Sequence, residues 1–225
     1  MADQKIKTSK NGPYLVSGSV PLQKENAVTN ALYPQKWEPD SVFPQKSTYA
    51  LCRCGKSSTM PYCDGAHIKN CFDGTECASR EPLDSKAVVI EGPSLNLIDY
   101  EELCAGARFC DAGMGTWEYT KTSDIDSHRQ AAIEQACNCP AGRLVAVDKD
   151  SGKRIEPDFD TSISVTFDQS IGKSGPLWVK GGIAVEACDG HVYEKRNRIT
   201  LCCCGRSKNK PFCDAAHLAD DSNSS

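Results

Sequence analysis

One cysteine–histidine pattern occurs twice in this chain, and no other sequence feature constrains the fold as strongly. The first copy spans residues 52–67 and the second spans residues 202–217, and both read C-x-C-x2-S-x3-P-x-C-D-x-x-H. Three thiolates and one imidazole at a fixed spacing are typical of a metal site. The sequence therefore predicts two metal sites, one near each end of the chain.

The spacing within the pattern bears on which metal is bound. Structural zinc sites also use three cysteines and one histidine, but two to four residues usually separate their paired cysteines. Here one residue separates Cys52 from Cys54, and an extended segment places both sulfurs on one face. Cys63 and His67 are four positions apart, which is one face of a helical turn. This spacing favours two ligand pairs that each hold one iron of a larger inorganic core, with structural zinc as the weaker alternative.

The remaining motif positions have structural explanations. Gly55 and Gly205 allow a tight turn and let backbone N–H groups approach the sulfurs. Asp64 and Asp214 stand where a helix N-cap belongs, just before the turn that carries the histidine. We expect these aspartates to act as caps and to take no part in chemistry.

The motif resembles that of the CDGSH-type iron–sulfur domain (NEET) family. The resemblance implies a [2Fe–2S] cluster at each copy, held by three cysteines and one histidine. Carried over by position, the ligands are Cys52, Cys54, Cys63 and His67 in the first copy and Cys202, Cys204, Cys213 and His217 in the second. Members with one motif form homodimers, so the resemblance implies a pseudo-twofold internal dimer and a monomeric chain.

The second copy departs from the first at two positions. Ala215 stands where the family usually has glycine, and we expect it to adopt a negative φ. Cys203 is inserted between two ligands, and strand alternation predicts that this thiol faces outward. Cys71, Cys77 and Cys188 fit no ligand pattern and are predicted to be free thiols.

The repetition extends beyond the ligands and divides the chain. Residues 12–18 are echoed by residues 175–181, and short strands are predicted at 49–51 and 199–201, just before the motifs. Residues 26–40 are interpreted as an inserted loop. We predict an α+β fold with these parts: a first CDGSH unit at 1–83, a different domain at 84–168, a second CDGSH unit at 169–219 and a disordered tail at 220–225.

The middle segment carries a weaker signal of its own. We predict a helix from Asp99 with a capping box to Glu102, a second helix over 126–136 and a strand over 144–147. Cys104-x5-Cys110 and the run Cys139-Pro140 resemble a divergent single-cluster ferredoxin domain, in which proline follows the last ligand. The resemblance implies a third cluster, [3Fe–4S] or [4Fe–4S], on Cys104, Cys110 and Cys139. Either Cys137 is a fourth ligand or the cluster has three, and the alternative is a cluster-free domain with buried cysteines.

The amino-acid composition bears on the cellular compartment and on the binding partners. Fourteen cysteines accompany a polar amino-terminal segment and no apolar membrane-length stretch, so we expect thiolates in a reducing cytoplasm, without a membrane partner. The net charge of −4 argues against general nucleic-acid binding. Residues 84–168 carry 16 acidic and 8 basic side chains, a net of −8 that leaves +4 elsewhere. Basic residues around the second motif are expected to form a solvated face or to pair with the middle domain, and the alternative is that they dock an acidic redox partner.

These observations predict a function and exclude others. We expect one-electron transfer or redox sensing by bound iron–sulfur clusters, with a redox protein as partner. Cluster storage and delivery to an apo-protein acceptor is the alternative. The sequence contains no P-loop, nucleotide-binding glycine fingerprint or Ser–His–Asp order, so we expect no enzyme activity.

Overall fold

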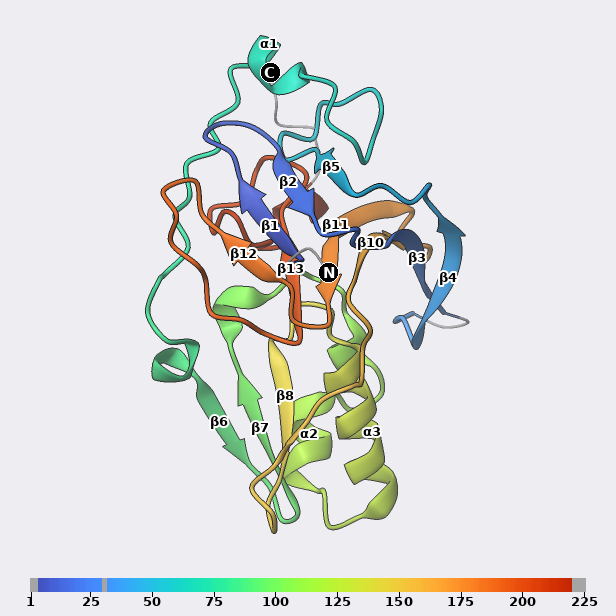
Figure 1. The fold of residues 1–225 in the computed structure, drawn as a ribbon. Helices are drawn as coiled ribbons and strands as arrows, with labels where there is room; N and C mark the ends of the chain where they lie inside the picture. Colours follow the sequence, from blue (N-terminus) through green and yellow to red (C-terminus); the bar gives the residue numbers. More distant parts are fainter. Residues whose placement is uncertain (1–3, 30–31, 220–225) are drawn as a thin grey trace.

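The computed structural model describes residues 4–29 and 32–219 (Figure 1). It is a mixed α+β fold with three sheets, mostly strands and few helices, as the sequence predicts. The predicted tail at 220–225 lies outside the described residues.

We call the part with the first motif the first unit. Its strands are β1 (Lys5–Thr8), β2 (Tyr14–Ser17), β3 (Leu22–Val28), β4 (Lys36–Val42) and β5 (Thr48–Leu51).

The second unit carries the second motif and repeats much of this order. Its strands are β10 (Ser162–Asp168), β11 (Lys173–Lys180), β12 (Ala184–Glu186) and β13 (Arg198–Leu201). The strands predicted just before the two motifs are confirmed as β5 and β13. The boundary at residue 168 stays a prediction. β10, which ends there, pairs with β11 and with β3 of the first unit.

The two units exchange strands. One sheet has the order β12-β1-β2-β5 and the other β13-β11-β10-β3-β4. β1 of the first unit pairs in parallel with β12 of the second, and β10 of the second pairs in parallel with β3 of the first. Each sheet therefore contains strands of both units, and neither sheet is complete without the other unit. The blue and orange strands lie interleaved in Figure 1. A twofold relation between the units stays a prediction.

Alternating side chains build one shared core between these sheets. Ile6 on β1, Tyr14 and Val16 on β2, and Ile163 on β10 are all at most 2% exposed and pack together. An ion pair between Glu25 on β3 and Lys180 on β11 is also buried, with side chains 7% exposed on both partners. Ser164 donates a further hydrogen bond to Glu25 Oε1 at 2.7 Å. A buried charge needs such partners, so this pair holds the two units in one register.

The predicted loop at residues 26–40 is wrong, because the structure has a β-hairpin there. β3 and β4 pair antiparallel from Gln23↔Val42 to Val28↔Lys36. The strand β4 is largely solvent-exposed and polar, so it lacks the alternation by which a half-buried strand is recognised. Trp37 on β4 packs against Trp178 at 5.0 Å and Phe109 at 5.1 Å between ring centroids, so the hairpin links the second unit to the middle domain.

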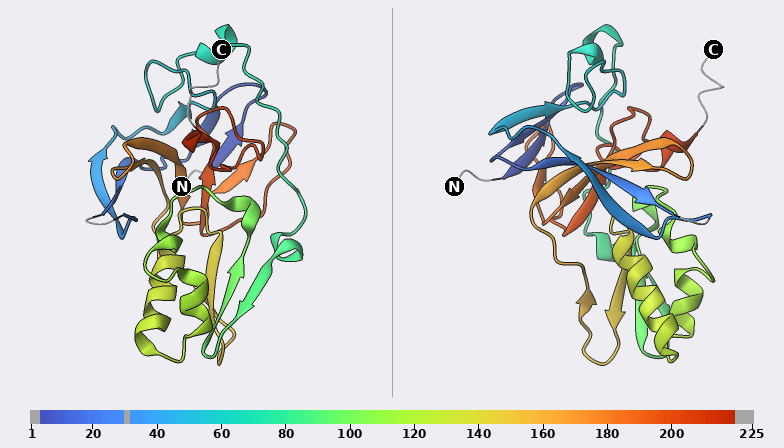
Figure 2. Two further views of the ribbon diagram at one scale, coloured as in Figure 1. Left: turned by 180° about the vertical axis from the view of Figure 1, so that it is seen from behind. Right: turned by 90° about the vertical axis from the view of Figure 1, so that its right-hand side faces the viewer.

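The middle domain is a sheet with both longer helices on one face (Figure 2). The sheet order is β6-β7-β8-β9. Its strands are β6 (Val88–Glu91), β7 (Leu95–Asp99), β8 (Leu144–Asp148) and β9 (Arg154–Ile155). Its helices are α2 (Thr116–Lys121), α3 (Asp126–Asn138) and the 3₁₀ turns η1 (Leu83–Lys86), η2 (Glu101–Leu103) and η3 (Phe109–Asp111). The second predicted helix and the predicted strand are confirmed as α3 and β8.

The helix predicted from Asp99 is wrong. Asp99 ends β7, where Leu95, Leu97 and Asp99 alternate into the core. Arg143 Nε binds Asp99 Oδ1 at 2.6 Å, which provides this buried carboxylate with a partner. After the single 3₁₀ turn η2, Gly106 has a φ of 69°, so the chain cannot continue as a right-handed helix.

Arg198 joins the second unit to the middle domain. Its side chain is 1% exposed and forms an ion pair with Glu156 at 2.8 Å. Its Nη1 donates to the carbonyls of Ala136 (2.5 Å), Cys137 (3.0 Å) and Cys139 (2.7 Å), at the end of α3. Carbonyls at a helix C-terminus have no intrahelical partner, and a buried cation satisfies them. This basic residue of the second motif region therefore pairs within the chain, with the acidic middle domain.

Candidate metal centres

Each motif forms a closed loop at the end of a strand. In the first unit, Cys52 N–H donates to Pro61 O at 2.8 Å and Cys63 N–H donates to Ala50 O at 2.9 Å. The second loop has the same closure, with hydrogen bonds from Cys202 N–H to Pro211 O at 2.8 Å and from Cys213 N–H to Thr200 O at 3.0 Å. The short turns α1 (Ala66–Lys69) and η4 (Ala216–Leu218) follow and carry the histidines.

The ligands meet in the two pairs that the spacing predicts. Cys52 Sγ lies 3.6 Å from Cys54 Sγ, and Cys63 Sγ lies 3.4 Å from His67 Nδ1. In the second loop the distances are 3.7 Å for Cys202–Cys204 and 3.5 Å for Cys213 Sγ to His217 Nδ1. The second loop thus has the same two kinds of ligand pair as the first loop, at nearly the same separations. A tetrahedral metal with bonds of about 2.3 Å to sulfur and 2.0 Å to nitrogen separates two sulfurs by about 3.7 Å, and sulfur from nitrogen by about 3.5 Å. Each pair therefore fits two ligands on one metal atom.

Three donors do not gather around one point. Within residues 4–29 and 32–219, no group of three or more Cys, His, Asp and Glu side chains is placed to hold a single metal ion. A mononuclear zinc site with three cysteines and one histidine needs all four donors at bonding distance from one ion. The arrangement of separated pairs instead suits a core with two metal atoms.

The motif serine and aspartate hold each loop in shape. Ser57 Oγ donates to Tyr62 O at 2.6 Å across the first loop. Asp64 accepts from Ser58 N–H at 2.8 Å and from Ala66 N–H at 3.0 Å, so it ties the loop to α1. These hydrogen bonds, with the one from Ser58 N–H foremost, hold the pKa of Asp64 well below its usual range.

The second loop repeats this pattern. Ser207 Oγ donates to Phe212 O at 2.7 Å, and Asp214 accepts from Lys208 N–H at 2.7 Å and Ala216 N–H at 3.1 Å. The aspartates thus bridge two segments, whereas the cap position itself is Gly65 or Ala215.

Two expectations about the second loop are wrong. Ala215 has a φ of 66°, like the φ of 87° at Gly65, so the alanine takes the left-handed conformation instead of a negative φ. Cys203 does not face outward, since it is half-buried, packs against the shared core and donates to Gly175 O at 3.3 Å. Burial raises the pKa of its thiol to about 12.

The two loops lie directly against each other. Cys54 and Cys204 form an antiparallel bridge between the units. A Cβ placed on Gly55 would lie 2.6 Å from Cys204 O, and one on Gly205 would lie 2.8 Å from Cys54 O. Both glycines also have positive φ values, 70° and 80°. Glycine is therefore required at both positions for backbone to approach backbone, a role that the sequence alone did not reveal.

Burial opposes the ionisation of two of the motif thiols. Burial raises the pKa of the Cys213 and Cys54 thiols above the ordinary value. A hydrogen bond with Cys202 lowers the pKa of Cys204 to about 6, so the pair readily holds one negative charge. Metal binding supplies the remaining driving force, because it displaces protons from coordinating thiols.

The residue between the paired cysteines differs in the two loops. Arg53 is 3% exposed and its guanidinium donates to Ser9 O at 3.0 Å and Gly74 O at 2.9 Å. Its counterpart in the second loop is the uncharged Cys203. The first loop therefore carries a buried positive charge on the residue between its paired cysteines, which the second loop lacks.

The middle-domain cysteines divide into two sets. Cys104, Cys110 and Cys139 line one cavity of ≈ 100 Å³. Burial raises the pKa of the Cys110 thiol to about 12, and the Cys139 and Cys104 thiols add to this. Cys137 does not line this cavity, and its Sγ lies 3.8 Å from Ile155 O. The structure thus brings together three of the four predicted thiols.

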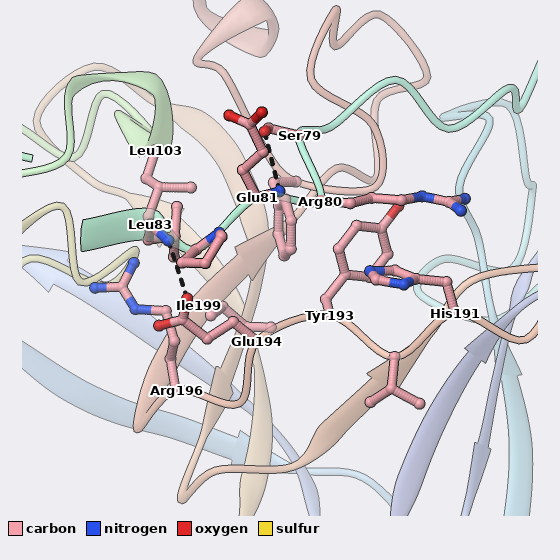
Figure 3. Close-up of a pocket in the computed structure, with 13 residues that line it drawn as sticks. Ser79, Arg80, Glu81, Leu83, Leu103, His191, Tyr193, Glu194, Arg196 and Ile199 are labelled. Carbon is pink, nitrogen blue, oxygen red and sulfur yellow. Dashed lines mark hydrogen bonds between the residues drawn. The ribbon is translucent and has the colours of Figure 1, made fainter. Parts of the chain in front are cut away.

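A larger cavity lies beside the second motif, where the segment after the first motif crosses the second unit (Figure 3). It measures ≈ 280 Å³, and its lining includes Arg80, Leu83, Leu103, Tyr193 and Phe212. Leu83 N–H donates to Glu194 Oε2 at 3.0 Å across it. Phe212 precedes the predicted ligand Cys213, so this cavity adjoins the second loop from outside.

Comparison with protein families agrees with the motif geometry. The family model described as iron-binding zinc finger, CDGSH type, matches residues 11–68 and 174–218. The chain carries two CDGSH segments. Together these segments contain all eight predicted ligands, whereas the middle domain lies outside both. The comparisons with curated proteins and with solved structures gave no match. Over the described residues, every helix is too short or too polar to cross a membrane.

Proposed function

We propose that this chain binds two [2Fe–2S] clusters, each through three cysteines and one histidine, and acts in one-electron transfer or redox sensing. The observation that carries the proposal is the pairing of ligands. Each loop presents two pairs at the separations expected for two ligands on one metal, yet no three donors converge on a single ion in the described residues. For this reason, a structural zinc site is the weaker alternative.

The residues of the chain determine how such a group would be held. The paired cysteines would bind one iron from the end of β5 or β13, and the third cysteine and the histidine Nδ1 would bind the other. A bound cluster would take up and release one electron. Replacing a thiolate by a neutral imidazole removes negative charge and raises the reduction potential relative to an all-cysteine site.

Metal analysis of anaerobically purified protein tests this proposal. Two [2Fe–2S] clusters predict about four irons and four sulfides per chain, a red-brown colour and little zinc. Colourless, sulfide-free protein with stoichiometric zinc would refute it.

A third cluster in the middle domain is part of the proposal. Its support is the convergence of Cys104, Cys110 and Cys139 on one cavity, without Cys137. Three thiolates suit a [3Fe–4S] cluster, or a [4Fe–4S] cluster with one iron open. A third cluster raises the iron content to about seven or eight, and Cys110→Ser should return it to about four. An unchanged iron content in that variant would exclude this site.

Cluster storage and delivery is the second candidate function. It is favoured by the half-buried position of Cys63 and His67, which contrasts with the buried Cys52 and Cys54. Incubation of the iron-loaded protein with an apo-ferredoxin separates the two functions. Movement of iron and sulfide to the acceptor supports delivery, whereas electron exchange without movement supports electron transfer.

A further inference from the structure

The two CDGSH segments are similar in sequence but not in their surroundings. At equivalent positions, Ile68 is 74% exposed whereas Leu218 is half-buried. Cys63 is half-buried whereas Cys213 is 2% exposed. The difference falls on the ligand pair that includes the histidine. At the other pair it is reversed, since Cys54 is 7% exposed and Cys204 is half-buried.

The middle domain covers the second site. A Cβ added to Gly106 would lie 2.5 Å from Leu218 Cδ1 and 3.0 Å from the Cβ of Ala215. The segment Ala105–Ala107 and Pro140 face His217 across a gap of only ≈ 20 Å³, which is room for about one water. Cys213 itself packs in one apolar cluster with residues of the middle domain, including Ala105 and Ala141.

The segment between the first unit and the middle domain adds a second cover. Cys77 N–H and Ala78 N–H both donate to Lys210 O at 2.9 Å, and beside them Asn209 Nδ2 donates to Glu102 O of the middle domain at 2.9 Å. Farther along, residues 79–83 line the larger cavity together with Phe212 (Figure 3). The second loop is thus held on two sides by other parts of the chain.

The first site has no such cover from the middle domain in the described part of the chain. Its turn α1 lies at the end of the molecule opposite the middle domain in Figure 1. Residues 58–60 and 68–71 around its ligands are exposed. The neighbour of its histidine is the β1–β2 turn, where a Cβ on Gly12 would lie 3.6 Å from His67 Nε2.

We propose that the cluster at the first site is exchanged with acceptor proteins and that the cluster at the second site is retained. This inference rests on the proposed cluster binding. In exchange, Cys52, Cys54, Cys63 and His67 give up four bonds to iron, and four donor groups of an apo-protein acceptor replace them, with no change of oxidation state. The released thiolates take up the protons that the acceptor thiols lose. At the second site, the middle domain blocks an incoming donor at His217 and Cys213.

The experiment uses the full-length iron-loaded protein at one neutral pH, with excess EDTA as the probe. Samples taken during chelation are alkylated, and mass spectrometry follows labelling of Cys63 and Cys213 separately while absorbance follows cluster loss. We expect Cys63 to become labelled roughly tenfold faster than Cys213, or more, with two phases of absorbance loss. Labelling of both cysteines at one rate, or of Cys213 first, would overturn the inference.

Matched variants test the cause of the difference. Leu218→Ala removes side-chain cover beside His217, so it should accelerate labelling of Cys213 and leave Cys63 unchanged. Ile68→Ala, at the equivalent exposed position, should alter neither rate. If Leu218→Ala does not fold, the wild-type labelling order still decides the inference. Protein without iron and sulfide refutes the proposed function instead, because the comparison then has no clusters to follow.

Discussion

At the scale of single residues, Ala215 has an unfavourable backbone conformation. Its φ of 66° places Cβ close to the following carbonyl, which costs about 1–2 kcal/mol. Ala215→Gly should therefore increase the free energy of unfolding by about 1 kcal/mol after the added entropy of the unfolded chain. For a chain of this length, the unfolding temperature should rise by about 2–4 °C. Thermal unfolding followed by circular dichroism measures the shift.

The first loop provides the reverse control. Gly65 has a φ of 87°, and a Cβ there would meet nothing within 4 Å. Gly65→Ala should lower stability by a similar amount through the backbone alone. A decrease in stability on Ala215→Gly would show that the alanine methyl contributes packing that outweighs the strain.

The histidine ligands make the sites sensitive to acid. Burial, with help from Arg206, lowers the pKa of His217 below its ordinary value of about 6.5. The unfolded state then binds more protons than the folded state, so the metal-free stability is unaffected above about pH 6.5 and decreases below it. Acid also competes with iron for Nδ1, so we expect cluster loss to accelerate over the same range.

The measurement is visible absorbance against pH for the wild type and for His67→Cys combined with His217→Cys. Thiolate ligands should shift the acid-labile range in the double variant, because no imidazole is left at either site. Identical pH profiles for the two proteins would exclude the histidines as the source of acid sensitivity.

At the scale of elements, α3 depends on a side chain from a distant strand. Arg198 on β13 is 1% exposed and binds three carbonyls at the end of α3, together with Glu156. Arg198→Met should lower the free energy of unfolding by about 3 kcal/mol, because it leaves buried carbonyls and a carboxylate without their partner. Chemical denaturation measures the change.

Arg154→Met is the matched control. Its ion pair with Asp84 is 45% and 64% exposed, so the loss should be below about 1 kcal/mol. Equal losses of unfolding free energy in the two variants would mean that the burial of Arg198 contributes nothing to stability.

Elements with a strong local signal were predictable from the sequence, and elements set by distant contacts were not. The strands before the motifs and the helix α3 follow from alternation and composition. The hairpin β3–β4 was missed because its second strand is polar and solvent-exposed. The prediction of a helix from Asp99 failed because Arg143 and Trp117 bind the Asp99 carboxylate from elsewhere in the fold, at 2.6 and 3.0 Å.

The candidate sites follow the same division. Ligand pairing was predictable because residues i and i+2 of an extended segment, and i and i+4 of a turn, share a face. The contact between the two loops and the cover over His217 were not, because Gly55, Gly205 and Gly106 carry no sign in the sequence of which backbone or side chain approaches them.

At the scale of the whole molecule, strand exchange predicts that the two units unfold together. Ile6 on β1 is fully buried and stands opposite Val185 on β12 of the other unit. Ile6→Ala should cost about 2–5 kcal/mol, because it leaves a cavity in the shared core. Hydrogen exchange should then speed up at β12 and β13 of the second unit as much as at β2 and β5 of the first. The control is Val89→Ala on β6, 53% exposed, which should change neither set of amides. Faster exchange confined to the first unit would show that the units unfold independently, despite the strands they share.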